Sequence, residues 1–593
     1  MNRVVSRSIV AISMITSIAV GQEQARTVLD TDTEFDEGSG ISTTPLTSVQ
    51  VENLAVLARM WGFLKYHHPR VATGELHWDY ELFRVLPLLL DSPDTASRND
   101  VLLTWAYRVS DPPPCDPCAA PPEDAHLLPR LNWIDDEVLG RELSEYLKRV
   151  HQRRISGGEQ FYVSAGSTAP NAQFPNESDY ADIRDPDMGY RLLALFRYWN
   201  IVQYWFPYID AMDDPWDGVL YEFIPRIAAA EGRRNFAQEL WALISKIDDS
   251  HAGLQGAPGL PPVGRCALPV GIRYVEGRPI VTLYTHDTRG PASGLEIGDV
   301  IQSLDGELVT SLVPEWSPYY PASNETGRLH KISTWITRGA CEEVALVVER
   351  DGQIIDLISE RSPFRELELR RSQVHDRPGP TFQMLFDDVA YLKLSTIAAA
   401  DIAGYFEAAR GTQGLIIDIR NYPAEFVVFE LGTRLVNERT PFVWFARPDF
   451  GNPGAFNWNP GPAYLDPQEP YYGGKVVVLV DETTLSQAEY TAMALRTGPN
   501  VLVVGSTTAG ADGNISAIPI PGGMRTIMTG LGVFYADKSP TQRVGIVPDV
   551  FATPTVSGIR QGRDEVLEQA LREIFGGSVD EQAIRAASKP PVQ

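Results

Sequence analysis

Residues 475–514 have the sequence KVVVLVDETTLSQAEYTAMALRTGPNVLVVGSTTAGADGN. This stretch predicts the local structure of the C-terminal part of the chain more clearly than any other. The β-branched run Val476–Val480 predicts a buried strand, and residues 487–496 predict a helix. Ser486 lies at the turn between them, and residues 501–513 continue as an apolar strand and a glycine-rich loop. The first N–H groups of a helix have no partner within it. This arrangement therefore exposes a hydroxyl beside donors that can hold an anion, as a nucleophilic serine requires.

Two further stretches extend the pattern in a fixed order. They are LIIDIRNYPAE at residues 415–425 and GIVPD at residues 545–549. Together with the S-x-x-E spacing of Ser486 and Glu489, they resemble the tail-specific (C-terminal processing) and tricorn-like serine peptidases of family S41. The resemblance covers residues 378–577. It implies an α/β peptidase domain of the ClpP/crotonase type, with Ser486 as the nucleophile and a polypeptide as the substrate.

The chain departs from the family at two loops. Most tail-specific members carry a lysine base in a G-K-G stretch, where this chain has Gly510-Ala511-Asp512. The paired glycines of the D-x-R motif are here Ala424 and Glu425. The resemblance implies that the N–H groups of Gln487 and Ala424 form the oxyanion hole, because alanine keeps the N–H while losing backbone freedom.

A base is needed to activate the serine. Ser250-His251 matches the serine–histidine pair of tricorn-like members, so the resemblance implies that both residues are catalytic and that His251 is the base. An imidazole titrates near neutral pH and can take and return a proton. The alternative is a histidine that interacts with the C-terminal dipole of a helix. Lys538 is a rival base whose pKa burial would have to lower.

Four other residues, Glu489, Asp418, Arg420 and Gln542, are assigned supporting roles. Glu489, one helical turn after Ser486, is expected to accept a hydrogen bond at the first turn of the helix. Asp418 and Arg420 are expected to form a buried ion pair that shapes the oxyanion loop.

The fourth catalytic member stays open. Tricorn-like enzymes place a glutamate shortly before the closing G-x-x-P-D motif, where this chain has Gln542, which resembles the glutamine of tail-specific relatives. Asp512 and Asp537 are further candidates to orient a partner, although neither occupies a motif position.

The N-terminal half contains an internal repeat. LARMWGFLKYHHP (57–69) and LFRYWNIVQYWFP (195–207) superpose at an offset of 138 residues. The matched pairs are Trp61 and Trp199, Tyr66 and Tyr204, Pro69 and Pro207, Trp78-Asp79 and Trp216-Asp217, and Pro87 and Pro225. Aromatic residues at helical spacing predict paired helical modules that pack together or cap the peptidase. A carbohydrate- or peptide-binding cleft lined by the tryptophans is the alternative, and a metal site at His67 and His68 is not favoured.

Residues 261–365 change to short alternating β runs. ASGLEIGDVIQSLDGELV (292–309) resembles the strand–turn element of PDZ domains, with turns at 298–299 and 305–306, and residues 344–357 supply a closing hairpin. PDZ domains bind chain ends as an added strand. The resemblance therefore implies a module that binds polypeptide ends; the alternative is a module that only gates the site.

Length and composition indicate the class of protein and the kind of partner. At 593 residues and 44% hydrophobic content the chain predicts a multidomain α+β protein, and its net charge of -26 argues against nucleic acid and anionic lipid as partners. The predicted order is a signal peptide (1–21), a disordered acidic linker (22–48), a helical module (49–156), a loop (157–187), a second helical module (188–260), the PDZ-like domain (261–365), the peptidase domain (378–577) and a tail (578–593).

The N-terminus and the cysteines both indicate export. Residues 1–21 carry two arginines followed by an apolar stretch, which predicts a cleaved secretory signal and a periplasmic or extracellular protein; an uncleaved anchor is the alternative. No later run is long enough to span a bilayer. Four cysteines in an exported protein fit two disulfides, with a four-cysteine zinc site as the alternative. The expected pairs are Cys115 with Cys118 and Cys266 with Cys341.

The sequence therefore predicts an exported serine-type endopeptidase with no cofactor and no metal. A catalytically inactive peptide-binding protein that retains the fold is the alternative, because the lysine is missing and the glycines are replaced. A metal-dependent hydrolase ranks last, since no HExxH motif or comparable ligand cluster is present. The physiological substrate and the oligomeric state are not predicted.

Overall fold

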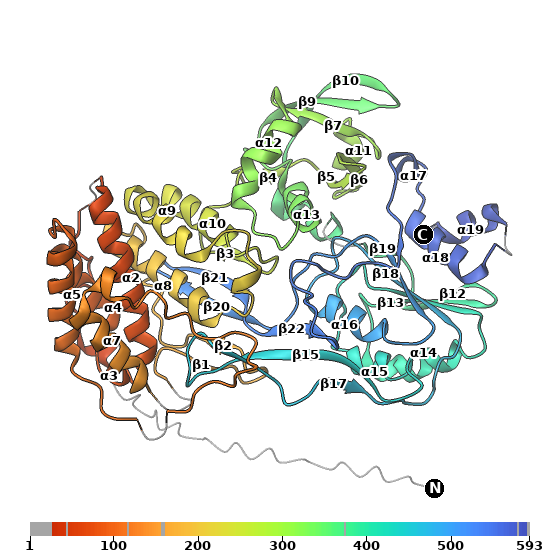
Figure 1. Ribbon diagram of the computed structural model, residues 1–593. Helices are drawn as coiled ribbons and strands as arrows, with labels where there is room; N and C mark the ends of the chain where they lie inside the picture. The colour runs from red at the N-terminus through yellow and green to blue at the C-terminus, as the bar shows by residue number, and fades with distance from the viewer. Residues whose placement is uncertain are drawn as a thin grey trace, which may run out of the picture.

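The computed structural model describes residues 27–42, 45–115, 118–155, 160–372, 375–577 and 580–589. Figure 1 shows a mixed α+β chain with a helical region at one end, a small sheet with helices in green, and a larger α/β region in cyan and blue at the other end. The predicted signal peptide lies outside the described residues. Within those residues, no helix combines the length and apolar character needed to cross a membrane.

Two long helices, α2 (Ser48–His67) and α8 (Met188–Trp205), organise the helical region. Each is followed by a shorter helix, α4 (Trp78–Leu90) or α9 (Trp216–Ala229), and α2 and α8 each pack against both shorter helices. Helix α8 is buried almost all round, which explains why its sequence is apolar on every face. The outer helices are α3 (Pro69–Ala72), α5 (Thr95–Val109), α6 (Asp136–Leu139), α7 (Arg141–Gln152) and α10 (Arg233–Ser245).

Contacts in the helical region recur at a spacing of 138 residues. The indole N–H of Trp61 donates to the carbonyl of Trp78 at 3.0 Å, and the indole N–H of Trp78 donates to the carbonyl of Trp61 at 2.9 Å. Trp199 and Trp216 form the same reciprocal pair, at 2.9 and 3.0 Å. Each indole therefore satisfies its one donor within a buried, apolar helix pair.

Residues at matched positions also contact each other where α2 and α8 cross. The ring of Tyr66 meets that of Tyr204 edge to face, with centroids 5.5 Å apart. Gly62 lies under the amide of Asn200, and a Cβ added at Gly62 would lie 1.9 Å from the Asn200 Cγ. Glycine is required at this position because no side chain fits between the two helices.

Four charged side chains are buried together between α2, α4 and α8. The Nζ of Lys65 lies 2.6 Å from Glu177 and 3.3 Å from Asp79, and Arg197 lies 2.6 Å from Asp79 and 2.8 Å from Glu177. None of the four side chains is more than 4% exposed. Burial alone would raise the pKa of Asp79, but Lys65 and Arg197 lower it well below its ordinary value.

Part of the predicted acidic linker is ordered. The interpretation of residues 22–48 as disordered is wrong for residues 27–42, which include the short helix α1 (Val28–Thr31) and lie against the helical region. Arg84 on α4 pairs with Asp32 at 2.8 Å and with Glu34 at 2.6 Å. A basic partner distant in sequence therefore neutralises the acidic residues that suggested disorder.

The small sheet region begins after the helices. Its strands run in the order β10-β9-β7-β6-β5, with β8 beside β7, and helix α13 (Glu325–Trp335) packs against the edge strand β5. The strands are β5 (Val270–Val275), β6 (Arg278–Tyr284), β7 (Val300–Leu304), β8 (Glu307–Leu308), β9 (Glu343–Arg350) and β10 (Gln353–Glu360). Helices α11 (Arg289–Ala292) and α12 (Val309–Trp316) lie in the same region. Disulfides join Cys266 to Cys341 and, in the helical region, Cys115 to Cys118.

The larger α/β region is built on a six-stranded sheet in the order β12-β13-β14-β18-β19-β23. All neighbours are parallel except β12 and β13. Helices α14 (Ile402–Ala408), α15 (Val428–Gly432) and α16 (Gln487–Leu495) share a core with one face, and α18 (Glu565–Phe575) and α19 (Glu581–Ser588) cover the other. The strands are β12 (Phe382–Phe386), β13 (Val389–Lys393), β14 (Gly414–Asp418), β18 (Lys475–Val480), β19 (Val501–Gly505) and β23 (Val550–Phe551). Burial on both faces explains the continuous apolar runs in the sequence.

Strands from this region also reach the helices (Figure 1). Side chains from β15 (Thr440–Pro448), β20 (Ile515–Ile520) and β21 (Met524–Thr529) belong to the same apolar core as α2 and α8. In return, β3 (Gly253–Gln255), which follows the helices, pairs with β21. The predicted boundary at residue 260 therefore cuts off a strand that completes a sheet of the α/β region. Strands β16 (Phe456–Trp458), β17 (Ala463–Leu465) and β22 (Gly532–Tyr535) pair with β15.

The buried charges give a first prediction. Asp79→Asn removes the anion that faces Lys65 and Arg197, so urea unfolding should show a loss of about 3–5 kcal/mol in the free energy of unfolding. Asp217→Asn is the matched control, because Asp217 occupies the corresponding position and pairs with Arg59 at 3.3 Å with its side chain 62% exposed. That substitution should cost less than about 1 kcal/mol. Equal losses in the two variants would contradict the difference in burial.

Candidate catalytic site

Ser486 lies where β18 ends and α16 begins. It is the N-cap of α16, and its backbone has φ 58° and ψ -124°. A positive φ is uncommon for a residue with a side chain and is retained only where the surroundings impose it. The N–H of Ser486 donates to the carbonyl of Ala511 at 2.9 Å, which ties the turn to the glycine-rich loop after β19. Its side chain is partly exposed, at the N-terminal end of α16.

Glu489 connects the first turn of α16 to the same loop. Its carboxylate accepts the N–H groups of Gly510 and Ala511, each at 2.9 Å, the hydroxyl of Thr508, and the N–H of Ser486 at 3.3 Å. The side chain is fully buried. Glu489 thus holds the loop and the turn in one arrangement, which is more than the local hydrogen bond expected from the sequence.

Burial changes the acidity of this cluster. Burial raises the pKa of Glu489 to about 7, although the hydrogen bonds from Thr508, Gly510 and Ala511 act to lower it. Burial, with the nearby charge of Glu489, also raises the pKa of Asp512 well above its ordinary value. The Oδ2 of Asp512 has no hydrogen-bond partner among the described residues. The loop that accepts the Ser486 N–H is therefore associated with two carboxyl groups of raised pKa, Asp512 within it and Glu489 bound to it.

His251 is held from one side only. Its Nδ1 lies 2.8 Å from the hydroxyl oxygen of Thr529 and 3.6 Å from Asp249. Its Nε2 is buried and has no hydrogen-bond partner within the described part of the chain. An imidazole with one nitrogen fixed and the other free has the geometry of a general base.

The structure brings the histidine turn and the serine turn to one loop. Ser250 donates its hydroxyl to the carbonyl of Ala509 at 2.7 Å, and the carbonyl of Ala511, two residues further on, accepts the N–H of Ser486. Ser250 also accepts the N–H of Ser323 at 2.9 Å. The hydroxyl of Ser250 is therefore already engaged, which fits a positioning residue, and the residues on either side of Gly510 connect the histidine turn to the serine turn.

Sequence reasoning missed Asp249. Its carboxylate accepts the N–H of His251 at 2.9 Å, and the N–H and hydroxyl of Thr529 at 2.6 and 3.1 Å. Burial alone would raise the pKa of Asp249, but His251 and the Thr529 N–H lower it below its ordinary value. The sequence does show an aspartate two positions before the histidine. Its role in orienting the ring becomes evident only when Thr529 is known to lie beside both residues.

Other candidates for the fourth catalytic member lie in different surroundings. The carboxylate of Asp537 accepts the N–H and hydroxyl of Ser539 in an exposed turn. Gln542 is buried, and its amide donates to Ser323 at 3.4 Å. Because Ser323 also contacts Ser250, Gln542 packs beside the Ser250–Ser323 pair.

Two predictions about the chemistry need correction. The N–H of Ala424 donates to the carbonyl of Leu394 at 3.0 Å, so in this conformation it is not the oxyanion donor that the resemblance implied. Lys538 is exposed, and its Nζ lies over the rings of Trp444 and Trp458 at 4.6 and 4.5 Å, so it has neither the burial nor the surroundings of a base.

The N–H of Gln487 remains as an oxyanion donor. It is the first residue of α16, and no hydrogen bond from its N–H occurs among the described residues. The Gln487 side chain donates to the carbonyl of Glu425 at 2.8 Å, which connects α16 to the loop that carries Ala424.

Asp418 and Arg420 form a buried pair at the end of β14. The guanidinium of Arg420 lies 2.7 Å from Asp418 and 2.8 Å from Asp564, which precedes α18. Tyr391 also donates to Asp418, at 2.8 Å. The network therefore connects the strand end to the helix on the opposite face of the sheet, and it is structural.

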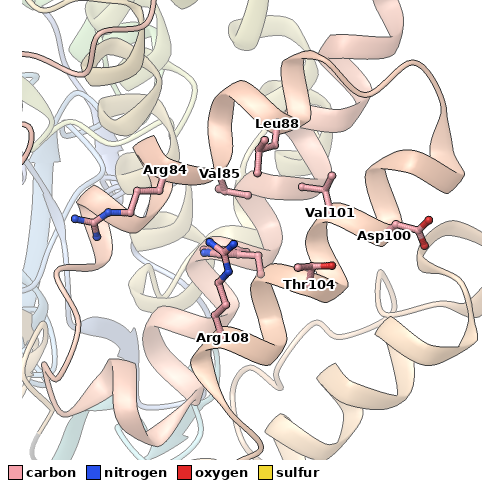
Figure 2. Close-up of a pocket in the computed structure, with 8 residues that line it drawn as sticks. Arg84, Val85, Leu88, Asp100, Val101, Thr104 and Arg108 are labelled. Atoms are coloured by element: carbon pink, nitrogen blue, oxygen red, sulfur yellow. The ribbon is translucent and has the colours of Figure 1, made fainter.

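The pocket drawn in Figure 2 is remote from this chemistry. It lies between α4 and α5, and the labelled side chains include Arg84 and Leu88 from α4 and Val101 and Arg108 from α5. It contains none of the residues of the serine and histidine turns. The catalytic candidates are therefore defined by hydrogen bonds around one loop and not by this cavity.

Comparison with known proteins concerns the family and the fold. Residues 388–552 match the model of peptidase family S41, and no curated protein matches the chain. Mature CPAF complexed with lactacystin is 13% identical to this chain; the match covers 67% of this chain and 99% of the CPAF chain, with a TM-score of 0.52. Mature CPAF alone is also 13% identical, with coverages of 66% and 99% and a TM-score of 0.52. The photosystem II D1 C-terminal processing protease is 17% identical, with coverages of 63% and 97% and a TM-score of 0.36.

The chain is therefore a serine-type peptidase. Residues 388–552 match the model of peptidase family S41, the family that the three sequence stretches resemble. The matched segment lies inside the predicted range of 378–577 and contains both Ser486 and the loop held by Glu489. At 13% identity the likeness to CPAF concerns the fold alone.

The raised pKa of Glu489 predicts a pH effect on stability. Between its ordinary value of 4.5 and about 7, the folded protein keeps a proton that the unfolded chain has released. Raising the pH through this window therefore favours unfolding. The free energy of unfolding of the wild type minus that of Glu489→Gln should fall by about 1–3 kcal/mol from pH 4.5 to 7. A difference that stays constant over this range would contradict the prediction.

Proposed function

We propose that the chain is an exported endopeptidase in which Ser486 is the nucleophile and His251 the base. The observation that carries the proposal is that His251 is fixed through Nδ1 and has a free Nε2, in a turn bound to the loop that also binds Ser486. The two disulfides and the apolar N-terminal stretch support export.

The proposed reaction is acyl transfer. The Oγ of Ser486 attacks a peptide carbonyl while its proton passes to the Nε2 of His251, and the N–H of Gln487 donates to the oxyanion. Protonated His251 then returns the proton to the amine as the C–N bond breaks. Water, activated by the same imidazole, hydrolyses the acyl-enzyme and regenerates Ser486. Asp249 and Thr529 orient the ring and stabilise its charged form.

The small sheet supports a role in holding substrate. Strand β5 is the edge strand of its sheet, and a cavity of about 280 Å³ lies between β5 and α13. Arg273 on β5 pairs with Asp481 at 3.0 Å and with Glu482 at 2.6 Å, in the turn that leads to Ser486. A PDZ-like module that adds a polypeptide end as a strand beside β5 would present it at the peptidase region.

A second candidate is an inactive peptide-binding protein that keeps the fold. The observation that favours it is the Ala424 N–H, which donates to Leu394 and leaves the oxyanion hole with one donor fewer than the family pattern. A fluorophosphonate probe separates the two candidates. Covalent labelling of Ser486, located by mass spectrometry, supports the peptidase, and absence of labelling from pH 5 to 9 supports the inactive protein.

The nucleophile is tested directly. Ser486→Ala should lower kcat/KM on an unfolded protein substrate by about 10⁴-fold or more, because no other group replaces the attacking oxygen. His251→Ala should have a similar effect, and Lys538→Ala, which removes the rival base, should leave the rate unchanged. Thermal unfolding of each variant confirms that the fold is retained. Wild-type turnover by Ser486→Ala would disprove the mechanism.

Asp249 gives a separate prediction as a positioning residue. Asp249→Asn should lower kcat by about 10²-fold with a smaller change in KM, since the ring loses its orientation and its stabilising charge. The acidic limb of the pH–rate profile should also move to lower pH, because the imidazolium is less stable without the carboxylate. A purely structural role for Asp249 would reduce activity without moving that limb.

A further inference from the structure

Glu177 fills a pocket in the helical region. It belongs to the loop before α8, and its carboxylate pairs with Lys65 on α2 and Arg197 on α8. Tyr180, from the same loop, donates its hydroxyl to Asp79 at 2.8 Å. A short peptide segment of the chain itself is therefore bound through one carboxylate and one hydroxyl.

The residues around Glu177 have counterparts at a spacing of 138 positions. Arg197 corresponds to Arg59, and Asp79 corresponds to Asp217. These counterparts form the same kind of ion pair with the roles of the helices exchanged: Arg197 of α8 pairs with Asp79 beside α2, and Arg59 of α2 pairs with Asp217 beside α8. The Gly62–Asn200 and Tyr66–Tyr204 contacts indicate the same two-fold relation between the two copies. Residues at matched positions contact each other only where they lie near the two-fold axis.

The second copy of the pocket is open. Arg59, Trp199, Gln203, Tyr204 and Asp217 line a cavity of about 690 Å³. They are the counterparts of Arg197, Trp61, Lys65, Tyr66 and Asp79, which surround the Glu177 site. The segment 129–133 and Asp210 form the remaining wall, where the charge of Asp210 is paired with Arg130. The same set of positions therefore appears twice, once closed by a loop and once facing solvent.

The open copy has unused hydrogen-bonding groups where the closed copy binds its loop. The Nε atoms of Arg59 and Arg197 are both buried without a hydrogen bond of good geometry among the described residues, but they differ in ion pairing. The Nε of Arg197 lies 2.8 Å from the Glu177 carboxylate, whereas the ion pair of Arg59 within the described residues is with Asp217. Asp217 is 62% exposed, and its counterpart Asp79 accepts the hydroxyl of Tyr180. A buried guanidinium N–H without a partner is costly and is well suited to a carboxylate.

We propose that this cavity is a binding site for the side-chain carboxylate of a glutamate or aspartate in a polypeptide. Arg59 holds the carboxylate, Gln203 donates an amide N–H in place of the Lys65 ammonium, and Trp199 and Tyr204 form the apolar wall. Because Gln203 is neutral, binding is weaker and more readily reversed than the closure of the first pocket by Glu177. The site lies outside the residues that match the peptidase family.

The chain supplies its own probe. Residues 174–180, which carry Glu177 and Tyr180, are prepared as an N-acetylated, C-amidated heptapeptide, together with a Glu177→Gln form. Isothermal titration calorimetry with the full chain should show binding of the glutamate peptide at least about 10-fold tighter than that of the glutamine peptide, since one charge-assisted interaction is lost. Equal affinity, or no heat at millimolar peptide, would disprove the proposal.

Three variants localise the binding. Arg59→Met should abolish preference for the glutamate peptide, and Gln203→Lys, which restores the donor found at Lys65, should tighten binding by about 10-fold. Arg108→Met changes an exposed arginine of the pocket in Figure 2 and should leave the affinity unchanged. Unchanged binding in Arg59→Met would overturn the assignment of the site.

The source of the carboxylate is tested with one more peptide. The glutamine form is prepared with a free C-terminal carboxylate instead of an amide. Its affinity should match that of the amidated glutamine form, because the side-chain position fixes where the charge enters the pocket. Binding as tight as that of the glutamate peptide would overturn the side-chain assignment in favour of a chain end.

Discussion

The pairing of β3 with β21 is the constraint on which the candidate site depends. Gly253 and Leu254 lie opposite Ile527 and Thr526, so the residues that follow His251 form an edge of a sheet whose other strands come from the α/β region. Backbone pairing fixes register as well as proximity, because a slip of one residue would reverse the face of every side chain. With this register Thr529 lies beside His251, and Asp249 can reach both.

A second constraint is the core that the helices share with the strands of the α/β region. Phe456, Ile518, Met524 and Phe534 are buried in the same cluster as the long helices, although they are remote from them in sequence. The helical region therefore does more than cover the peptidase region. It supplies the histidine turn, and it is held in place because apolar side chains from strands of the α/β region are buried in its core.

Much of the site could be predicted because the information is local. A β-branched run, a serine and a helix with a glutamate one turn later define the Ser486 turn, and each lies within a few residues of the next. The histidine was accessible only through family resemblance. Asp249, the Ala424 N–H and the acidic segment at 27–42 could not be predicted, because their partners Thr529, Leu394 and Arg84 are distant in sequence. Composition indicated disorder where pairing with Arg84 gives order.

The two arginine–aspartate pairs illustrate how a duplicated element can diverge. Around Arg197 and Asp79 the charged partners Lys65 and Glu177 are buried, so the loss of one of these charges leaves another without a partner. Around Arg59 and Asp217 solvent can compensate for a change, and the neutral Gln203 occupies the position that corresponds to Lys65. The buried copy therefore constrains its own sequence, whereas the solvent-facing copy can accept substitutions without leaving a buried charge unpaired.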